Sequence, residues 1–354
     1  MEPVTHLLTG AVLSRACGFN KRTLYATATM VLAAELPDID IVYDVQGPVH
    51  YFQHFRGWTH SFLGLPLEAL LLLTLVFLWS RLRPHQPRAG DPLLRWGILF
   101  CGSLLALTSH VLLDWTNSYG VRPFAPFNPR WYQGEFVFLF EPLILAALVL
   151  ALILPPLFAL TDGEVGARKQ RFRGQGSAIA ALLFILALWG YRFTQHEKAV
   201  AIAQQQLYPQ DASIVSIRMN PYAATPYEWH AVVETPAYYQ TGTINTRLGT
   251  MDFTPQEIYF KGAVTPATQI AEASPLGRVY MDWSRAPLVD DLGLLANQQD
   301  VTLNGLHAVR FRDLRFLYNT FAFQGQEKAP LSGTVYLDAQ NKIVRTEMNG
   351  TRQR

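Results

Sequence analysis

Charged residues are scarce in this 354-residue chain, and their distribution is uneven. Asp, Glu, Lys and Arg make up 16% of the sequence and hydrophobic residues 50%, whereas an ordinary soluble protein has about 25% charged residues. The long apolar runs lie before about residue 194, and the remainder reads as soluble sequence. The composition therefore excludes a uniformly soluble chain and predicts a membrane region followed by a soluble domain.

Cysteine is nearly absent, and the net charge is small. Cys17 and Cys101 lie far apart in apolar segments, so both are interpreted as small hydrophobic residues and not as a disulfide or a metal-binding pair. A net charge of +2 argues for no particular partner. Nothing in the sequence resembles a nucleic-acid-binding module, and no basic stripe is interleaved with aromatic residues. Residues 1–5 lack a basic stretch, and no small-residue cleavage site follows, so no cleavable signal peptide is expected.

The first half of the chain contains long hydrophobic segments. A helix that crosses a membrane needs about 20 mostly apolar residues. Four segments meet this requirement, namely 61–80, 96–113, 136–159 and 177–194. Two shorter ones, 4–17 and 23–36, could be short tilted spans, re-entrant helices or interfacial helices.

Lys and Arg residues orient the membrane region if all six segments cross. Eleven then lie on one side: Arg15, Lys21, Arg22, Arg81, Arg83, Arg88, Arg95, Arg168, Lys169, Arg171 and Arg173. Three lie on the other side: Arg56, Arg122 and Arg130. Because basic loops stay in the cytoplasm, both termini are expected outside. In this topology His and acidic residues gather at the outer surface: His6, Asp38, Asp40, His54, His60, His110, Asp114 and Glu141.

The pair His110 and Asp114 has metal-ligand spacing. Residues four apart share one face of a helix, so the pair could bind one ion or could be a hydrogen-bonded pair at a helix end. The convergence of the other residues favours the metal. His6 is interpreted as a further ligand for the same reason. Glu141, in an apolar run, needs a metal or a basic partner. Glu68 is left outside the set of ligands.

Asp38 and Asp40 follow Pro37 and would project to the same side of an extended segment. Two carboxylates this close repel each other unless a cation lies between them. The alternative is a solvated turn with Asp38 as a helix N-cap. We favour the interpretation as a metal site, in which one of the two Asp residues, Asp40 first, binds the metal. The other would then support the ligands without binding the metal itself. Either could also accept a proton from water.

His54 and His60 bracket Arg56 in the next cluster. Neutral imidazole is the commonest metal ligand, so both histidines are candidate ligands. The planar guanidinium of Arg56 suits a phosphate or a carboxylate, which predicts a clamp for an anionic substrate. The alternative for Arg56 is a structural ion pair or a lipid-headgroup contact. Thr59 or Ser61 could cap the following helix.

These motifs resemble those of the YdjM-type family of bacterial inner-membrane proteins, whose motifs have been interpreted as those of metal-dependent hydrolases. The resemblance covers roughly residues 1–145. It consists of His6, the Leu-Pro-Asp-x-Asp element at 36–40, the Arg-Gly-x-Thr-His-Ser element at 56–61, the pair His110 and Asp114, and a Gly120 turn before two Pro-Phe pairs. His54 departs from the family pattern because Phe55 separates it from Arg56, and Glu141-Pro142 replaces the usual Asp-Pro.

The remaining chain is expected to form a soluble β domain. Alternating residues and turn signals predict antiparallel strands at 213–218, 228–234, 238–245, 278–282, 307–312 and 333–338. The expected fold class is α+β: a helical membrane domain over 1–194, a helical neck over 195–210 and an extracytoplasmic β-rich domain over 211–354.

Taken together, the sequence predicts a multi-pass inner-membrane hydrolase that uses one or two divalent ions, with zinc favoured and manganese or iron as alternatives. Asp38, Asp40 and Arg56 are the expected catalytic residues. Expected partners are the lipid bilayer and a small-molecule or lipid substrate, such as a phosphoester or another ester. Two further hypotheses remain: a metal-binding or transport protein, and a structural protein that displays the β domain.

Overall fold

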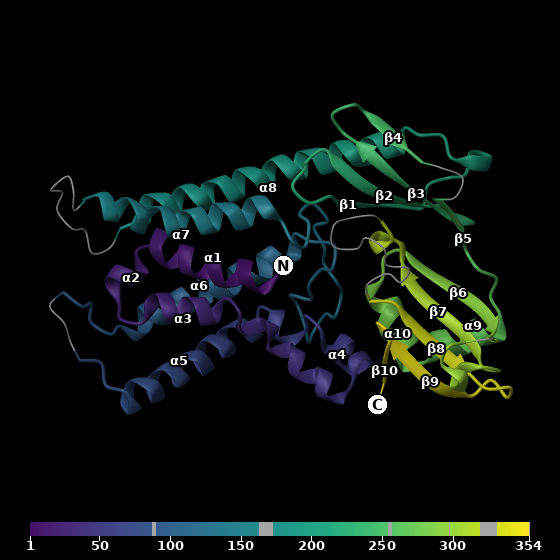
Figure 1. Ribbon diagram of the computed structural model, residues 1–354, viewed down its shortest axis with the longest axis horizontal. Helices are drawn as coiled ribbons and strands as arrows, with labels where there is room; N and C mark the ends of the chain where they lie inside the picture. Colours follow the sequence, from purple (N-terminus) through teal and green to yellow (C-terminus); the bar gives the residue numbers. More distant parts are fainter. Residues whose placement is uncertain (87–89, 163–172, 254–256, 297, 319–330, 354) are drawn as a thin grey trace. The chain divides into compact units, whose positions relative to one another are not determined.

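A computed structural model of the protein describes residues 1–86, 90–162, 173–253, 257–296, 298–318 and 331–353. The chain divides into two compact units (Figure 1). The first comprises Met1–Asp40 and Arg56–Arg192, and the second Ile41–Phe55 and Phe193–Arg354. Four of the basic residues used for the orientation, Arg88, Arg168, Lys169 and Arg171, lie outside the described residues.

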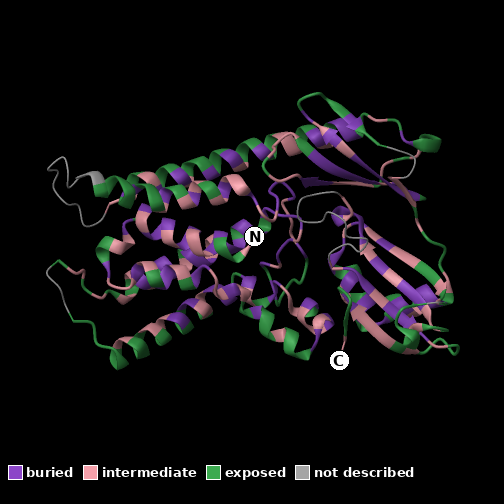
Figure 2. Cartoon of the chain, in the orientation of Figure 1, coloured by how far each residue is buried: buried purple, intermediate pink, exposed green. Residues whose placement is uncertain are grey.

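Four helices are long and apolar enough to cross a membrane: α5 (Gly64–Leu82), α6 (Trp96–Trp115), α7 (Pro142–Asp162) and α8 (Gln175–Gln204). They confirm that the four long predicted segments form helices of sufficient length and apolar character. Many apolar side chains on them are exposed (Figure 2), as expected of surfaces that face lipid. Helix α7 begins later than residue 136, at Pro142, because proline lacks the N–H that an interior position needs and suits a first turn.

The two shorter hydrophobic segments are helices that are too short to cross alone. Helix α1 (Pro3–Ala16) has 14 residues and α3 (Ala26–Ala33) has 8, joined through α2 (Phe19–Arg22). At about 1.5 Å per residue they are about 21 Å and 12 Å long, against about 30 Å of hydrocarbon. Six crossing segments are therefore not confirmed. The two helices pack closely at Gly10, where a Cβ would lie 2.5 Å from the carbonyl oxygen of Met30.

The core of the first unit lies among α1, α3, α5 and α6, where buried residues such as Leu13, Met30, Ala69 and Leu107 meet. Short elements connect α3 to α5. They are η1 (Leu36–Gln46), α4 (Pro48–His54) and η2 (Trp58–His60). The ends of η1 and α6, together with η2, carry most of the predicted metal ligands.

The second unit contains two antiparallel sheets, which confirms the predicted antiparallel β domain. One sheet has the order β1-β2-β3-β4, with β5 also paired to β3. Its strands are β1 (Ser216–Pro221), β2 (Glu228–Glu234), β3 (Tyr238–Asn245), β4 (Thr250–Asp252) and β5 (Ile258–Phe260). The other has the order β10-β9-β8-β7-β6. Its strands are β6 (Pro287–Leu294), β7 (His307–Asp313), β8 (Gly333–Leu337), β9 (Ile343–Met348) and β10 (Thr351–Arg352).

Helices α9 (Pro266–Ala273) and α10 (Pro275–Trp283) accompany the sheets, and α10 corrects one prediction. Residues 278–282 are helical and not a strand. The hydroxyl of Ser274 accepts a hydrogen bond from the N–H of Gly277, and Pro275 occupies the first turn, both of which start helices. Leu276, Tyr280 and Trp283 are buried at helical spacing. Among its described residues the unit also has three short 3₁₀ helices, η3 (Pro209–Asp211), η5 (Val301–Leu303) and η6 (Leu314–Phe316).

Candidate metal centre

Four predicted site residues converge at one end of the first unit. Asp38 comes from η1, His60 from η2, and His110 and Asp114 from α6. One ligand atom of each lies within 4.8 Å of those of the other three. His60, His110 and Asp114 are fully buried, whereas the side chain of Asp38 is 30% exposed. The cluster therefore opens on the Asp38 side.

The fold of α6 fixes the orientation of His110. His110 and Asp114 share one helix face, and Nε2 of His110 lies 3.5 Å from Oδ2 of Asp114. On the other side of the ring, Nδ1 lies 2.7 Å from the carbonyl oxygen of Ala34. Because a carbonyl oxygen only accepts hydrogen bonds, Nδ1 carries the proton. In the neutral ring Nε2 would then present a lone pair to a bound cation, as in a metal-ligating histidine. Without a cation, a protonated Nε2 can donate to Oδ1 of Asp38 at 3.5 Å.

His60 presents its Nε2 to the same point. This atom lies 3.1 Å from Nε2 of His110, 3.4 Å from Oδ2 of Asp114 and 3.6 Å from Oδ1 of Asp38. The other ring nitrogen, Nδ1, lies 3.0 Å from the hydroxyl of Thr59. Two facing imidazole nitrogens with carboxylates around them need a shared proton or a cation between them. The donor set therefore fits a divalent metal ion.

Ser61 holds the turn that carries His60. Its hydroxyl donates a hydrogen bond to the carbonyl oxygen of Trp58 at 2.8 Å and accepts one from the N–H of Gly64 at 3.0 Å. Of the two capping candidates, it is thus Ser61 that bonds to the first residue of α5, while Thr59 contacts His60. The Arg-Gly-x-Thr-His-Ser element is therefore a compact turn that delivers an imidazole to the end of a helix.

Asp38 and Asp40 both lie within 4 Å of His60 but differ in their other contacts. The segment forms a 3₁₀ helix and not an extended strand, and with about three residues per turn two residues two apart point in different directions. Asp38 enters the cluster, whereas Asp40 accepts a hydrogen bond from the backbone N–H of Arg56 at 2.8 Å. Burial acts to raise the pKa of Asp38, but hydrogen bonds with His110 and His60 hold it well below its usual range. Burial raises the pKa of Asp40.

Arg56 is buried and pairs with the cluster. Its Nη2 lies 2.8 Å from Oδ2 of Asp114, and its Nη1 donates to the carbonyl oxygen of Gly120 at 3.1 Å. Of the two interpretations of Arg56, the ion pair is present in the structure. The contact with an anionic substrate stays a prediction.

The turn that follows α6 supports Arg56, a role that was not predicted for it. The side-chain oxygen of Asn117 accepts a hydrogen bond from the N–H of Tyr119 at 2.8 Å and contacts Arg56 at 3.4 Å. Gly120 has a φ of +83°, and a Cβ there would lie 2.8 Å from the carbonyl oxygen of Tyr132, so the turn requires glycine. Asn followed three residues later by Gly is a turn signal that could have indicated this support.

His6 lies beside the four-residue cluster. Its ring stacks on that of His110 with centroids 3.8 Å apart, and its Nε2 lies 3.4 Å from Oδ1 of Asp114. Both ring nitrogens are buried without a hydrogen-bond partner among the described residues. A buried unsatisfied imidazole is costly. The assignment of His6 as a ligand stays a prediction, because the four-residue cluster does not include it. The amino group of Met1 also contacts Asp114.

The structure does not bring His54 and Glu141 into the cluster. His54 belongs to the second unit, where its Nδ1 lies 3.0 Å from the carbonyl oxygen of His50 and its ring stacks on Tyr43. Glu141 is fully buried, with Oε2 2.6 Å from Nη2 of Arg192. This pair supplies the basic partner considered as an alternative to the metal. The assignment of both residues as ligands stays a prediction.

Comparisons with known proteins identify a family that spans the cluster. The family described as "YdjM inner membrane protein" matches residues 1–199, which include all four cluster residues. A relative, the uncharacterised protein YfhP of Bacillus subtilis (strain 168), is 28% identical over 151 residues. That match covers 41% of this chain and 43% of the relative, so the chain spans less than half of that protein's length. No solved structure matches. Since the family match covers more than half of the chain, this protein belongs to the YdjM inner membrane protein family.

Proposed function

We propose that this protein is a membrane-embedded, metal-dependent hydrolase whose metal is held by Asp38, His60, His110 and Asp114. The observation that carries the proposal is the convergence of two imidazoles and two carboxylates at one buried point. Zinc suits this nitrogen and oxygen donor set, and manganese or iron are alternatives. A bound divalent ion would supply Lewis acidity and make water a nucleophile near neutral pH.

In this proposal the residues around the cluster admit water, accept its proton and orient the ligands. Asp38 lies on the exposed side of the cluster, where water and substrate would enter. Either Asp38 or Asp40 accepts the proton of the attacking water. Arg56 orients Asp114 through their ion pair and places a positive charge beside the site. His6 stacks on His110 and supports the position of its ring.

The proposed substrate is a phosphoester at the outer surface of the cytoplasmic membrane, including a lipid phosphoester. Two features support this class. The centre lies at an end of membrane helices and not at their middle, because His110 and Asp114 are in the last two turns of α6. Arg56 provides a charge that favours an anionic substrate. Carboxylic esters are the second substrate class.

Hydrolysis by purified protein in detergent tests the proposal. After loading with zinc or manganese, the wild type should cleave phosphodiester and lipid phosphoester substrates. His60→Ala should abolish cleavage while the protein remains folded, whereas His85→Ala, outside the cluster, should retain it. Cleavage by wild type and His60→Ala at equal rates would contradict the proposal, as would inactivity of the metal-loaded wild type against both ester classes.

Metal transport is the second candidate function, and one observation favours it. Glu68, in the first half of α5, has a buried carboxylate oxygen without a hydrogen-bond partner among the described residues. Ionisable groups within a membrane commonly mark ion pathways. Under this function, proteoliposomes should take up zinc or manganese, and Glu68→Gln should block the uptake. Under the hydrolase function, Glu68→Gln leaves cleavage in place and no uptake occurs.

The orientation of the C-terminal domain is also a proposal, supported by the excess of basic residues on one side of the membrane region. A cysteine at Ser213 and another at Arg83 would test it, in a background where Cys17 and Cys101 are Ser. A membrane-impermeant maleimide applied to intact spheroplasts should label position 213 and spare position 83. The reverse pattern would place the domain in the cytoplasm.

A further inference from the structure

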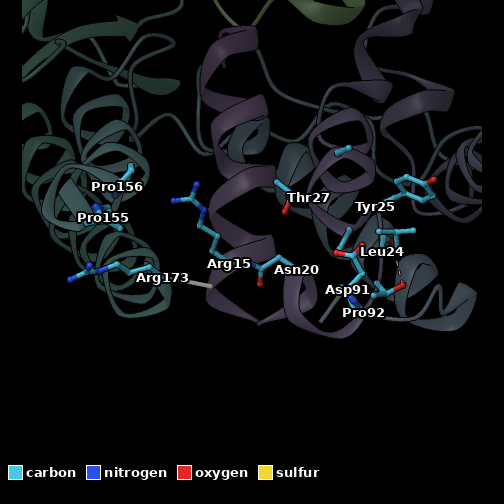
Figure 3. Close-up of a pocket in the computed structure, with 14 residues that line it drawn as sticks. Arg15, Asn20, Leu24, Tyr25, Thr27, Asp91, Pro92, Pro155, Pro156 and Arg173 are labelled. Carbon is cyan, nitrogen blue, oxygen red and sulfur yellow. Dashed lines mark hydrogen bonds between the residues drawn. The ribbon is translucent and has the colours of Figure 1, made fainter. Parts of the chain in front are cut away.

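An open cavity of about 570 Å³ lies in the first unit, at the end of the α1–α3 hairpin opposite the metal cluster. It is lined by the end of α1, by α2 and the start of α3, by Asp91 and Pro92, by the C-terminal part of α7, and by Arg173 just before α8 (Figure 3). Along α1, Arg15 is nine residues from His6, or about 14 Å. The cavity is therefore separate from the metal centre.

Two prolines in α7 shape one wall of this cavity. Pro155 and Pro156 cannot donate to the carbonyl oxygens four residues earlier, Ala151 and Leu152. Side chains satisfy both oxygens instead. The hydroxyl of Ser177 donates to the Ala151 oxygen at 3.0 Å, and Nη1 of Arg15 donates to the Leu152 oxygen at 3.2 Å.

This contact fixes the guanidinium of Arg15 at the wall of the cavity (Figure 3). One hydrogen bond to a neutral carbonyl leaves the charge of Arg15 without compensation from that partner. The planar fork of arginine carries five N–H donors, which suit a phosphate. The hydrogen bond to the Leu152 carbonyl oxygen therefore holds Arg15 in place, and most of the N–H donors of its guanidinium remain for a ligand.

The charges that line the cavity favour an anion. Arg173 is the second basic residue of the lining, on the same side as Pro155 in Figure 3. The acidic residue Asp91 lies on the opposite side of that view and accepts from His85 at 2.8 Å. Between them, the side-chain oxygen of Asn20 is buried and has no hydrogen-bond partner within the described ranges. A hydroxyl of a bound molecule would satisfy it.

The cavity lies near the ends of several long apolar helices, a position that suits lipid headgroups. Its residues are at the ends of membrane-spanning helices, where Trp79 at the end of α5 and Trp96 at the start of α6 have the placement of interfacial aromatic anchors. The α1–α3 hairpin is shorter than the hydrocarbon thickness. Helix α7 continues past the cavity wall at Pro155 and Pro156 to Asp162, so an acyl chain beside α7 could reach the cavity.

We propose that this cavity binds the phosphate of an anionic phospholipid headgroup, with Arg15 and Arg173 as the phosphate ligands and Asn20 as the partner of a headgroup hydroxyl. The same chemistry could recognise free phosphate. The lipid is the favoured source because the cavity lies among the ends of membrane spans and one wall is apolar, formed by Pro155, Pro156 and Ala159.

Native mass spectrometry of the full chain in a neutral detergent tests this site. Delipidated protein is titrated with phosphatidylglycerol, with zwitterionic phosphatidylcholine, and with inorganic phosphate alone. The wild type should bind one phosphatidylglycerol in preference to phosphatidylcholine. Arg15→Gln and Arg173→Gln should each weaken this binding by about tenfold or more, which corresponds to the loss of a charge-assisted contact. Arg83→Gln, an exposed arginine at the end of α5, is the matched control and should bind as the wild type does.

The outcomes separate the alternatives. Arg15 also satisfies a backbone carbonyl, so thermal unfolding identifies an Arg15→Gln protein that is merely misfolded, and Arg173→Gln then carries the test. Saturable binding of inorganic phosphate that competes with the lipid and is lost in Arg173→Gln would support the phosphate site and identify free phosphate as a ligand. Equal binding of phosphatidylglycerol by Arg173→Gln and Arg83→Gln would overturn the proposal, as would equal affinity for both lipids.

Discussion

The pairing of Arg56 with Asp114 sets the charge of the metal centre. Asp114 is fully buried and receives contacts from Arg56, His6 and the amino group of Met1. A buried carboxylate needs such compensation because desolvation of a charge is expensive. The backbone of Arg56 is held as firmly as its side chain, since its N–H donates to Asp40. Arg56 therefore links Asp40 and Asp114 into one arrangement.

The variant Arg56→Lys should distinguish the contribution of the positive charge of Arg56 from that of its planar hydrogen-bonding geometry. Lysine keeps the positive charge but cannot contact Asp114 and Gly120 at once. We expect metal affinity to fall about 10–100-fold, as when support of a ligand is lost. Competition with a chromophoric chelator measures this affinity. Arg130→Lys, at an exposed arginine between α6 and α7, is the control, and equal loss in both variants would contradict a specific role for Arg56.

For individual residues, the sequence predicted the type of site and the residues in it better than it predicted which side chains contact one another. His60, His110 and Asp114 were identified because helical spacing and a short motif are local properties. The division between Asp38 and Asp40 was not, because it depends on a 3₁₀ helix where an extended segment was assumed. The pairing of Glu141 with Arg192 joins residues far apart in the chain, and spacing within a motif carries no information about such contacts.

Among the elements, the turn after α6 supports the site without touching a metal. Its glycine is needed for two reasons. The positive φ of Gly120 disfavours other residues, and the carbonyl oxygen of Tyr132 approaches the space that a Cβ would fill. The carbonyl oxygen of Gly120 accepts from Arg56. A change in this turn should therefore reach the cluster through Arg56.

Gly120→Ala should reduce stability by about 1–3 kcal/mol, the usual cost of a strained backbone position. Gly190→Ala in α8 is the matched control, because a Cβ there meets nothing within 4 Å. Alanine inside a helix should be neutral or stabilising by up to about 1 kcal/mol. Thermal unfolding in detergent compares the two. A Gly120→Ala protein as stable as Gly190→Ala would show that the turn adapts and does not constrain Arg56.

The long membrane helices were predictable because their length and apolar character are read directly from sequence. The short α1 and α3 and the strands were harder. The composition of the 14-residue helix α1 is similar to that of a membrane span. Only the ends of the helix, which the structure shows, reveal that it is shorter. Residues 278–282 alternate as a strand does, yet the cap at Ser274 and the burial of Tyr280 and Trp283 favour a helix.

At the scale of the molecule, the β-rich unit has a stability that should depend on pH through His230. This residue is buried in β2, with Nε2 3.0 Å from the carbonyl oxygen of Leu314 and its ring stacked on Tyr318. Burial lowers the pKa of His230 to about 4, against the raising effects of the Leu314 hydrogen bond and of Asp313. The unfolded chain, with an ordinary histidine pKa near about 6.5, binds this proton more readily.

Stability of this unit should therefore fall as the pH decreases from 7 to 5. In that window the unfolded state binds more protons than the folded state, so acidification favours unfolding. The contribution of His230 is about 2 kcal/mol over the two pH units. Pulse proteolysis of the full chain in urea measures it. His230→Gln should remove most of the dependence, and His196→Gln should retain it; equal pH dependence in both would contradict this role.

The central claim is that Asp38, His60, His110 and Asp114 form a metal centre in an inner-membrane protein. Elemental analysis of the detergent-purified protein tests it most directly, comparing the wild type with a His60→Ala/His110→Ala variant of equal folded fraction. We predict near-stoichiometric divalent metal in the wild type, with zinc the favoured ion, and loss of that metal in the variant. A folded wild type that contains no metal after reconstitution with zinc, manganese or iron would contradict the account, as would a variant that retains the metal of the wild type.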